Sequence, residues 1–405
     1  MKLAKRIAAG LLCAAAACSF TACKDTTWAY KIQDTTITAG MYIAYQINAY
    51  MEAQNEAEDT TKDVLEQQID GKDATAWINE KVLEYCKSYV AVEQKFKELG
   101  LSFSDSDKNI LETQLENMWY YYQSLYEPNG AGKQSVKKIL ENSYKSNLIF
   151  KKYYDTDGIE AVSEEDLKKE FTDNYALVKY IQMPMKDAEG NKLKTEGKEE
   201  LKKKAEAYVE RLNNKENIDD LIAEYEKILE EQEAAANDTS SDTSSGTSSG
   251  SSSADASSNV SSAADTSSAA DTSSAADTSS TASGSASSGT SSGSTEEEEE
   301  IDPNEVIIYK EDETLAQKFK DGIFGAQVGV PTIVEDDENY YVTIRYDILA
   351  DESKYEDYHD TLLSNLKGDE YDEMVKSWYT DYSVDTNEDS VKRYKLTNIE
   401  FPSYS

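Results

Sequence analysis

VSEEDLKKEFTDNYALVKYIQM, residues 162–183, is the stretch in which this chain changes from helix to strand. Ser163 is a residue type that caps helices, and it precedes a short helix predicted over residues 164–171. Residues 177–183 are mostly apolar and include β-branched side chains, which predicts a strand. Helices before this stretch and strands after it indicate an α+β fold class.

Upstream of the stretch, residues 24–158 have helical patterns. A short extended entry is predicted over 28–37, and Thr38 follows it as a candidate N-cap. The strongest helix is predicted over about 75–99, where apolar residues recur alternately four and three apart before Gly100. Ser104 opens a capping-box-like start of the next helix, and a further helix is predicted over 135–153. This pattern is typical of a bundle of long helices with one-sided apolar stripes.

Downstream, short strands alternate with short helices. A helix is predicted around Leu201–Leu212, and a second, short helix around Leu221–Tyr225. Further along the chain, strands are predicted over 306–309, 332–334 and 340–345, and helices over 315–324, 355–366 and 371–382. A final extended piece carries Tyr394, Leu396 and Ile399. Asp187–Gly190 has the composition of a turn.

Residues 237–295 consist almost entirely of Ser, Thr, Ala, Gly and Asp, and a glutamate run closes the segment at residue 300. Such a composition offers too little apolar surface to offset the entropy of ordering the chain, so disorder is predicted. The segment can be a linker between domains or a loop extruded from one domain. A solvated tether is the favoured interpretation, and O-glycosylation of its serines is the alternative.

The first residues have the pattern of an export signal. Three cations, Lys2, Lys5 and Arg6, precede a short apolar core over 7–17. The segment 20–23, Phe-Thr-Ala-Cys, resembles a bacterial lipobox, with 15–18 as a weaker competitor. We therefore expect a signal peptide over 1–22 and a diacylated Cys23 that anchors the protein to the outer face of the cytoplasmic membrane. The alternative is an ordinary secretory signal cut near Ala22.

Charge and rare residues limit the chemistry. The formal net charge is -38, and removal of the leader takes away three cations and no acid. Such a field repels phosphate backbones, so no nucleic-acid partner is expected. Once the leader is removed and Cys23 is acylated, Cys86 keeps the one free thiol, so no internal disulfide and no cysteine zinc site is expected. Cys86 lies among apolar positions of a helical pattern and is predicted to be a small core residue. We expect no metal and no cofactor, and we place the single histidine, His359, on a solvated helix face.

The order of elements resembles extracytoplasmic foldases of the SurA/PrsA type, which combine a trigger-factor-like helical chaperone domain with a parvulin-type peptidyl-prolyl isomerase domain. The resemblance covers most of residues 75–395. Residues 96–101 are similar to the family's helix–Leu-Gly-Leu–helix joint, and residues 162–167 are similar to its entry to the isomerase domain. Residues 178–181 resemble the first parvulin strand, and 319–324, 328–329 and 340–342 resemble motifs near the end of that domain.

The resemblance implies a set of domain boundaries. These are the lipoprotein signal peptide at 1–22, a helical chaperone domain at 23–158, the parvulin-like domain in two parts at 159–236 and 301–350, a disordered insert at 237–300 between them, and a C-terminal helical segment at 351–405. The predicted strand at 177–183 would otherwise leave its backbone groups unpaired. Its implied partners are the strands at 340–345 and 332–334.

Departures from the family pattern concern its active site. Parvulin sites carry two histidines, whereas this chain has Tyr180 at the first position and Tyr341, or Val342 if the alignment slips by one, at the second. The usual Gly-Gly-Asp-Leu-Gly segment is absent. Isomerisation requires lowering a barrier of about 18–20 kcal/mol. We therefore expect no catalytic residue and interpret Tyr180, Phe319, Phe324 and Tyr341 as a degenerate prolyl pocket.

Together these features predict a membrane-anchored chaperone that binds unfolded or newly secreted polypeptides outside the cytoplasm. An active prolyl isomerase is one alternative, and a surface-binding or spacer lipoprotein is another. The densest tyrosine cluster, at 119–122, is expected to serve mostly in core packing. A few of its rings could form an adaptable surface for unfolded chains, because a tyrosine ring is apolar while its hydroxyl stays hydrated.

Overall fold

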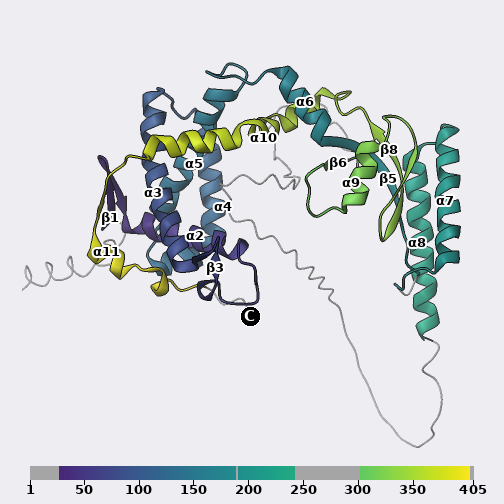
Figure 1. Cartoon of the computed structure of the whole chain (residues 1–405), viewed down its shortest axis with the longest axis horizontal. Helices are drawn as coiled ribbons and strands as arrows, with labels where there is room; N and C mark the ends of the chain where they lie inside the picture. Colours follow the sequence, from purple (N-terminus) through teal and green to yellow (C-terminus); the bar gives the residue numbers. More distant parts are fainter. Residues whose placement is uncertain (1–26, 188–189, 242–301, 402–405) are drawn as a thin grey trace, which may run out of the picture. The chain divides into compact units, whose positions relative to one another are not determined.

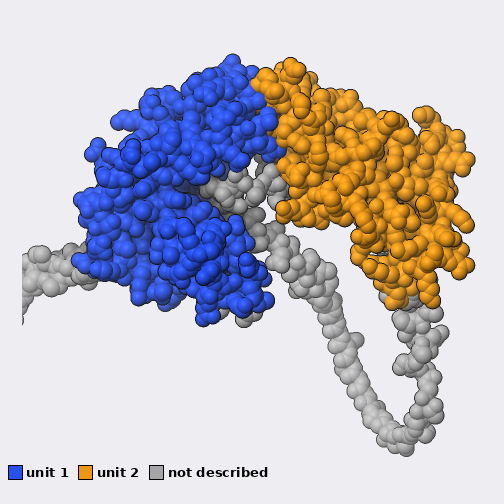
Figure 2. Space-filling model, viewed as in Figure 1, with its two compact units in different colours: residues 1–162, 273–280, 363–405 blue, residues 163–272, 281–362 orange. Residues whose placement is uncertain are grey.

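The computed structural model describes residues 27–187, 190–241 and 302–401. They form helices and small antiparallel sheets, which confirms the α+β class (Figure 1). The chain divides into two compact units, shown in separate colours in Figure 2. Of the described residues, unit 1 contains 27–162 and 363–401, and unit 2 contains 163–187, 190–241 and 302–362. The boundaries expected for the functional domains stay predictions.

The helices of unit 1 begin and end where the capping residues indicate. They include α2 (Ala39–Asn55), α3 (Ala74–Glu98), α4 (Asp105–Asn129) and α5 (Lys133–Tyr154). The side chain of Thr38 caps α2, and Ser104 forms a reciprocal capping box with Asp107 at the start of α4. Gly100, at φ +66°, takes the left-handed conformation that ends α3. The predictions for Thr38, Ser104 and Gly100 are confirmed.

The core of unit 1 lies between α2 and α3. Fully buried side chains there include Met41, Ile78, Val82 and Cys86. Burial raises the pKa of the Cys86 thiol, so this cysteine is a protonated, inert core residue as predicted. A second cluster joins the other side of α2 to α4 and α5.

The end of the chain returns to its beginning within unit 1. β1 (Trp28–Ile32) pairs on one side with β2 (Thr35–Thr38) and on the other with β9 (Val384–Thr386). The extended piece predicted around Tyr394, Leu396 and Ile399 is wrong, because the short 3-10 helix η2 (Leu396–Asn398) lies there, after α11 (Glu388–Arg393). The side chain of Asn387 caps α11, and Leu396 is buried in the core, so local turns replace a strand.

Small elements complete unit 1. They are η1 (Val64–Glu66), β3 (Gln68–Ile69) and β4 (Lys72–Asp73), of which the last two form a two-stranded hairpin.

Unit 2 is built on a four-stranded antiparallel sheet in the order β6-β5-β8-β7. Its strands are β5 (Tyr175–Pro184), β6 (Val306–Tyr309), β7 (Thr332–Glu335) and β8 (Asn339–Tyr346). Ile181 pairs with Val342, which confirms the partnership predicted between 177–183 and 340–345. β7 pairs with β8 and not with β5, because a short turn joins β7 and β8 as a hairpin. Strands on both sides of residues 242–301 thus belong to one sheet.

Helices cover both faces of this sheet (Figure 1). α7 (Thr195–Asn213) and α8 (Ile218–Ser241) pack on the face that carries Ile181 and Met183. α9 (Gln317–Gly325) packs on the face that carries Val178 and Tyr180. α6 (Glu164–Asn174) begins at the predicted cap Ser163.

Two predicted helix boundaries are wrong. α10 (Glu352–Tyr379) is one helix where two were predicted, since a single glycine, Gly368, costs only about 1 kcal/mol in a helix and does not end it. α8 extends to Ser241, into the segment predicted to be disordered from residue 237. The Glu and Ala residues before 237 favour helix, and the helix continues for about one more turn beyond them. The rest of that segment, the leader with Cys23, and residues 188–189 of the predicted turn lie outside the described residues.

Candidate functional site

Three of the predicted pocket residues meet on one face of the sheet in unit 2. Tyr180 lies on β5 and Tyr341 on β8, as diagonal neighbours across the two strands. Their ring centroids are 5.6 Å apart, with the rings nearly perpendicular. Phe319 from α9 lies 5.6 Å from Tyr180 and 4.3 Å from Tyr341. The fold therefore brings together aromatic residues from three elements into one cluster.

This aromatic cluster is packed and not open. Phe319 is 3% exposed and Tyr341 is 7% exposed, while Tyr180 is half-buried. Val178, Ile323 and other apolar residues surround them. The apolar side chains fill the space between α9 and the sheet, so the cluster has the character of a core.

The hydroxyl of Tyr341 is fully engaged. It donates a hydrogen bond of 2.9 Å to Oδ2 of Asp336 and accepts one of 3.0 Å from Nδ2 of Asn339. Burial, followed by the bond to Asp336, raises the pKa of Tyr341 well above its ordinary value. The phenol is therefore neutral at physiological pH, and its proton holds the turn between β7 and β8.

Asp336 is the polar centre of that turn. Its Oδ1 accepts hydrogen bonds from the backbone N–H groups of Glu338, at 2.7 Å, and Asn339, at 2.6 Å. Burial alone would raise the pKa of Asp336, but these hydrogen bonds outweigh it and hold the pKa below its ordinary value. The carboxylate is thus a satisfied structural acceptor.

Phe324 lies at the edge of the cluster. It is partly buried, and its backbone carbonyl accepts a hydrogen bond of 3.0 Å from Nη1 of Arg345. The guanidinium of Arg345 lies 5.5 Å from the centre of the ring, and Nζ of Lys310 lies 5.8 Å from it. Phe324 therefore faces two cations, whereas Tyr180, Phe319 and Tyr341 face one another.

A buried lysine on β5 escaped the sequence analysis. The side chain of Lys179 is 8% exposed and forms ion pairs with Asp219, at 2.9 Å, and with Asp302. Burial would lower the pKa of Lys179, but the two carboxylates outweigh it and raise the pKa. The available signal was a lysine within the otherwise apolar run 177–181. Its partners are far away in sequence and could not be named from it.

His359 lies on α10 and not in the aromatic cluster. Its side chain is 24% exposed, with Nδ1 3.6 Å from a carboxylate oxygen of Asp360, and its ring lies 6.5 Å from that of Tyr355. The imidazole is therefore partly exposed on α10, with the ring of Tyr355 beside it.

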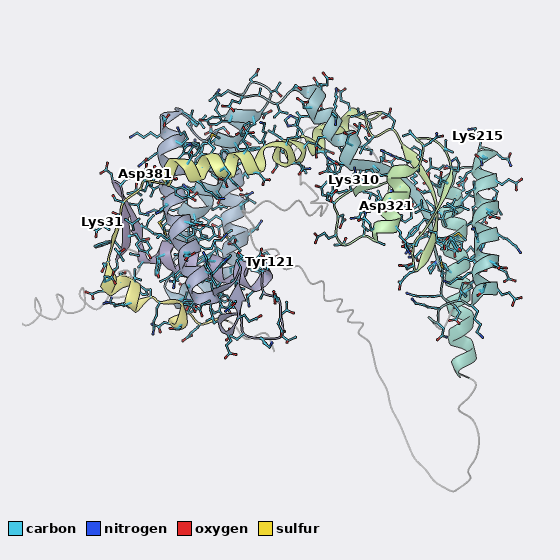
Figure 3. All side chains as sticks on the ribbon, viewed as in Figure 1. Lys31, Tyr121, Lys215, Lys310, Asp321 and Asp381 are labelled. Atoms are coloured by element: carbon cyan, nitrogen blue, oxygen red, sulfur yellow. The ribbon has the colours of Figure 1, made fainter. Side chains whose placement is uncertain are left out.

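The tyrosine cluster on α4 in unit 1 divides between core and surface. Trp119 and Tyr122 are half-buried against the second core cluster, as predicted for packing. Tyr120 and Tyr121 are each 73% exposed, and their ring centroids lie 5.2 Å apart. Figure 3 labels Tyr121. The two tyrosines are the most exposed of the large apolar side chains in the described residues. A single helix thus presents an aromatic pair to solvent.

Unit 1 also contains a small cavity of about 200 Å³. It lies between the end of α4, at Pro128 and Asn129, and the tail from Arg393 to Glu400. None of the predicted pocket residues lines it.

The described residues offer neither a metal centre nor a membrane span. They contain no group of three or more His, Cys, Asp or Glu side chains placed to hold a metal ion. Among their helices, none combines the length and the hydrophobicity needed to cross a bilayer.

Comparison with solved structures finds foldases of the type that the sequence resembles. Foldase protein PrsA from Streptococcus pneumoniae str. Canada MDR_19A is 13% identical over 80% of this chain and 87% of its own, with a TM-score of 0.32. PrsA from Bacillus subtilis is 13% identical over 77% and 87%, with a TM-score of 0.24. Foldase protein PrsA from Lactococcus lactis is 9% identical over 91% and 99%, with a TM-score of 0.33.

No family model and no curated protein matches the chain.

Proposed function

We propose that this chain is an extracytoplasmic chaperone, anchored to the membrane through Cys23, which binds unfolded or newly secreted polypeptides without isomerising prolyl bonds. The observation that carries the proposal is the exposure of Tyr120 and Tyr121 on α4. Tyrosine gives a large contact area at a low cost in conformational entropy, and its hydroxyl tolerates both apolar and polar partners. Such a surface suits clients of varied sequence.

The packed state of the aromatic cluster in unit 2 supports binding without catalysis. Tyr341 is 7% exposed and its hydroxyl already has two partners. A general acid or a hydrogen-bond donor must reach the peptide on which it acts, within about 2.6–3.2 Å. Of Tyr180, Phe319 and Tyr341, only Tyr180 has appreciable exposure. This site therefore offers a single half-buried phenol where a parvulin site has two histidine side chains.

Suppression of aggregation tests the proposal. An unfolded client is diluted into buffer with the protein, and light scattering is followed. The wild type should reduce scattering, and the double variant Tyr120→Ala/Tyr121→Ala should lose most of this effect. Ile159→Ala is the matched control, since Ile159 is 55% exposed in the same unit but lies outside α4. Wild-type protein that leaves scattering unchanged would favour the spacer alternative.

A further inference from the structure

The aromatic pair on α4 lies within an acidic helix. Between Asp105 and Asn129, α4 contains five acidic residues and one lysine. Glu112, Glu116, Tyr120, Gln123 and Glu127 follow one another at spacings of four, four, three and four residues. This spacing places them in one stripe along the helix. All five are exposed, and we call them the α4 stripe.

Two of the three glutamates in the α4 stripe keep their charge unpaired. Glu116 forms an ion pair of 2.6 Å with Lys133. Glu112 and Glu127 form no ion pair with the described residues, although Lys–Glu pairs are common elsewhere on the surface. Glu127 lies two helical turns beyond Tyr120, about 10 Å along the axis, and Glu112 lies slightly more than two turns before it. The tyrosine is therefore bracketed by free carboxylates on its own face.

From this arrangement we infer that the α4 stripe binds extended polypeptide segments that carry basic and apolar residues a few positions apart on the same side of the chain. This inference rests on the proposed chaperone function and names its class of client. An extended chain advances by about 3.3 Å per residue, and its side chains alternate between two sides. A lysine about four residues from an apolar side chain on Tyr120 therefore lies on the same side, and its long side chain reaches Glu127. The net charge of -38 adds long-range attraction for basic chains and repels acidic ones.

Fluorescence anisotropy on the full chain tests the inference. Three labelled, disordered peptides of equal length share leucine and phenylalanine positions and differ in the residues between them, which are lysine, glutamine or glutamate. We expect the lysine peptide to bind most tightly. Its affinity should fall as the salt concentration rises above about 0.1 M, where the Debye length is about 10 Å. The glutamate peptide should bind most weakly.

Glutamate-to-glutamine variants separate attraction by the α4 stripe from attraction by the net charge of the whole protein. Glu112→Gln/Glu127→Gln should weaken the lysine peptide about threefold to tenfold and leave the glutamine peptide unchanged. The matched control is Glu373→Gln/Glu388→Gln, which removes two exposed carboxylates of unit 1 outside α4. Tyr120→Ala should weaken both peptides. Circular dichroism of each variant verifies that α4 is intact, as expected for substitutions at exposed positions.

The outcomes separate the two proposals. Binding of none of the peptides would overturn the chaperone proposal itself. Equal binding of all three peptides, or equal loss in the Glu112/Glu127 and control variants, would overturn the client class and leave the chaperone proposal standing. Sedimentation that shows a dimer which Tyr120→Ala converts to a monomer would assign the stripe to self-association and overturn the inference.

Discussion

Gly322 of α9 lies so close to Val334 of β7 that no side chain fits between them. A Cβ atom on Gly322 would lie 2.8 Å from Cγ2 of the valine and closer still to Cγ1. The χ1 rotation of valine is restricted, so its methyl groups have little freedom to move aside. This approach lets α9 bring Phe319 onto Tyr341.

Gly322→Ala is therefore expected to destabilise unit 2 by about 1–3 kcal/mol through overpacking, despite the better helix propensity of alanine. Hydrogen exchange of the β7 and β8 amides measures the effect locally. Gly325→Ala is the control on the same helix, since a Cβ there meets no atom within 4 Å. An equal response of the two variants would show that the contact with Val334 does not limit the packing.

Removal of the buried charge on β5 should also weaken unit 2. Lys179→Met keeps the length of the side chain but leaves Asp219 and Asp302 facing each other without a cation. Breaking a buried pair costs about 3–5 kcal/mol, and partial exposure of both aspartates reduces this to about 1–3 kcal/mol. Hydrogen exchange of the β5 amides measures this loss of stability. Lys318→Met, at a surface ion pair, should change little. Unaltered β5 exchange in Lys179→Met would contradict the expectation.

Stability should fall in acid. The pKa of Asp302, beside Lys179, and the pKa of Asp336, with its two backbone hydrogen bonds, both lie below the ordinary value for aspartate. The unfolded chain therefore takes up protons first as pH falls, and the stabilisation present at neutral pH is lost below about pH 5. Denaturant unfolding at a series of pH values measures the slope. Asp336→Asn should flatten it, and a variant with the wild-type slope would exclude Asp336 as a source.

Prolyl isomerisation should not be accelerated. In a proline-limited exchange assay, the wild type and Tyr341→Phe should both match the uncatalysed rate, since the Tyr341 hydroxyl is engaged by Asp336 and Asn339. Tyr341→Phe should instead cost about 1 kcal/mol of stability, because Asp336 loses a hydrogen-bond donor. Turnover that disappears in Tyr180→Ala or Tyr341→Ala would overturn the proposal and promote the isomerase alternative.

Cys23→Ala is expected to release the protein from membranes, because the cysteine of the 20–23 segment would carry the lipid. Fractionation of cells expressing each variant measures this. Cys18→Ala is the control and should stay membrane-bound. The reverse result, with Cys18→Ala released and Cys23→Ala retained, would move the cleavage site to the competing segment at 15–18.

Local sequence signals predicted most of the helices and strands. The features that could not be predicted depend on contacts between residues far apart in the sequence. Thr38, Gly100 and Ser104 fix helix ends through contacts with residues a few positions away, so the sequence reveals them. Tyr180, Phe319 and Tyr341 were grouped through the family resemblance, and the sheet register places them in contact. The partners of Lys179 and the pairing of β1 with β9 involve residues far apart in sequence, for which a single chain carries no local signal. The exposure of Tyr120 likewise depends on which helices cover α4.

The pairing of β1 with β9 also has a consequence for the order in which the protein acquires structure. The side chain of Asn387 donates a hydrogen bond of 2.9 Å to the carbonyl of Trp28, across 359 residues. In a chain that is exported from its N-terminus, β1 emerges outside the membrane long before its partner β9. The sheet of unit 1 is complete only when residues 384–386 have emerged, after the residues of unit 2. Such non-local closure is slow, so the protein would itself pass through a long-lived, incompletely folded stage.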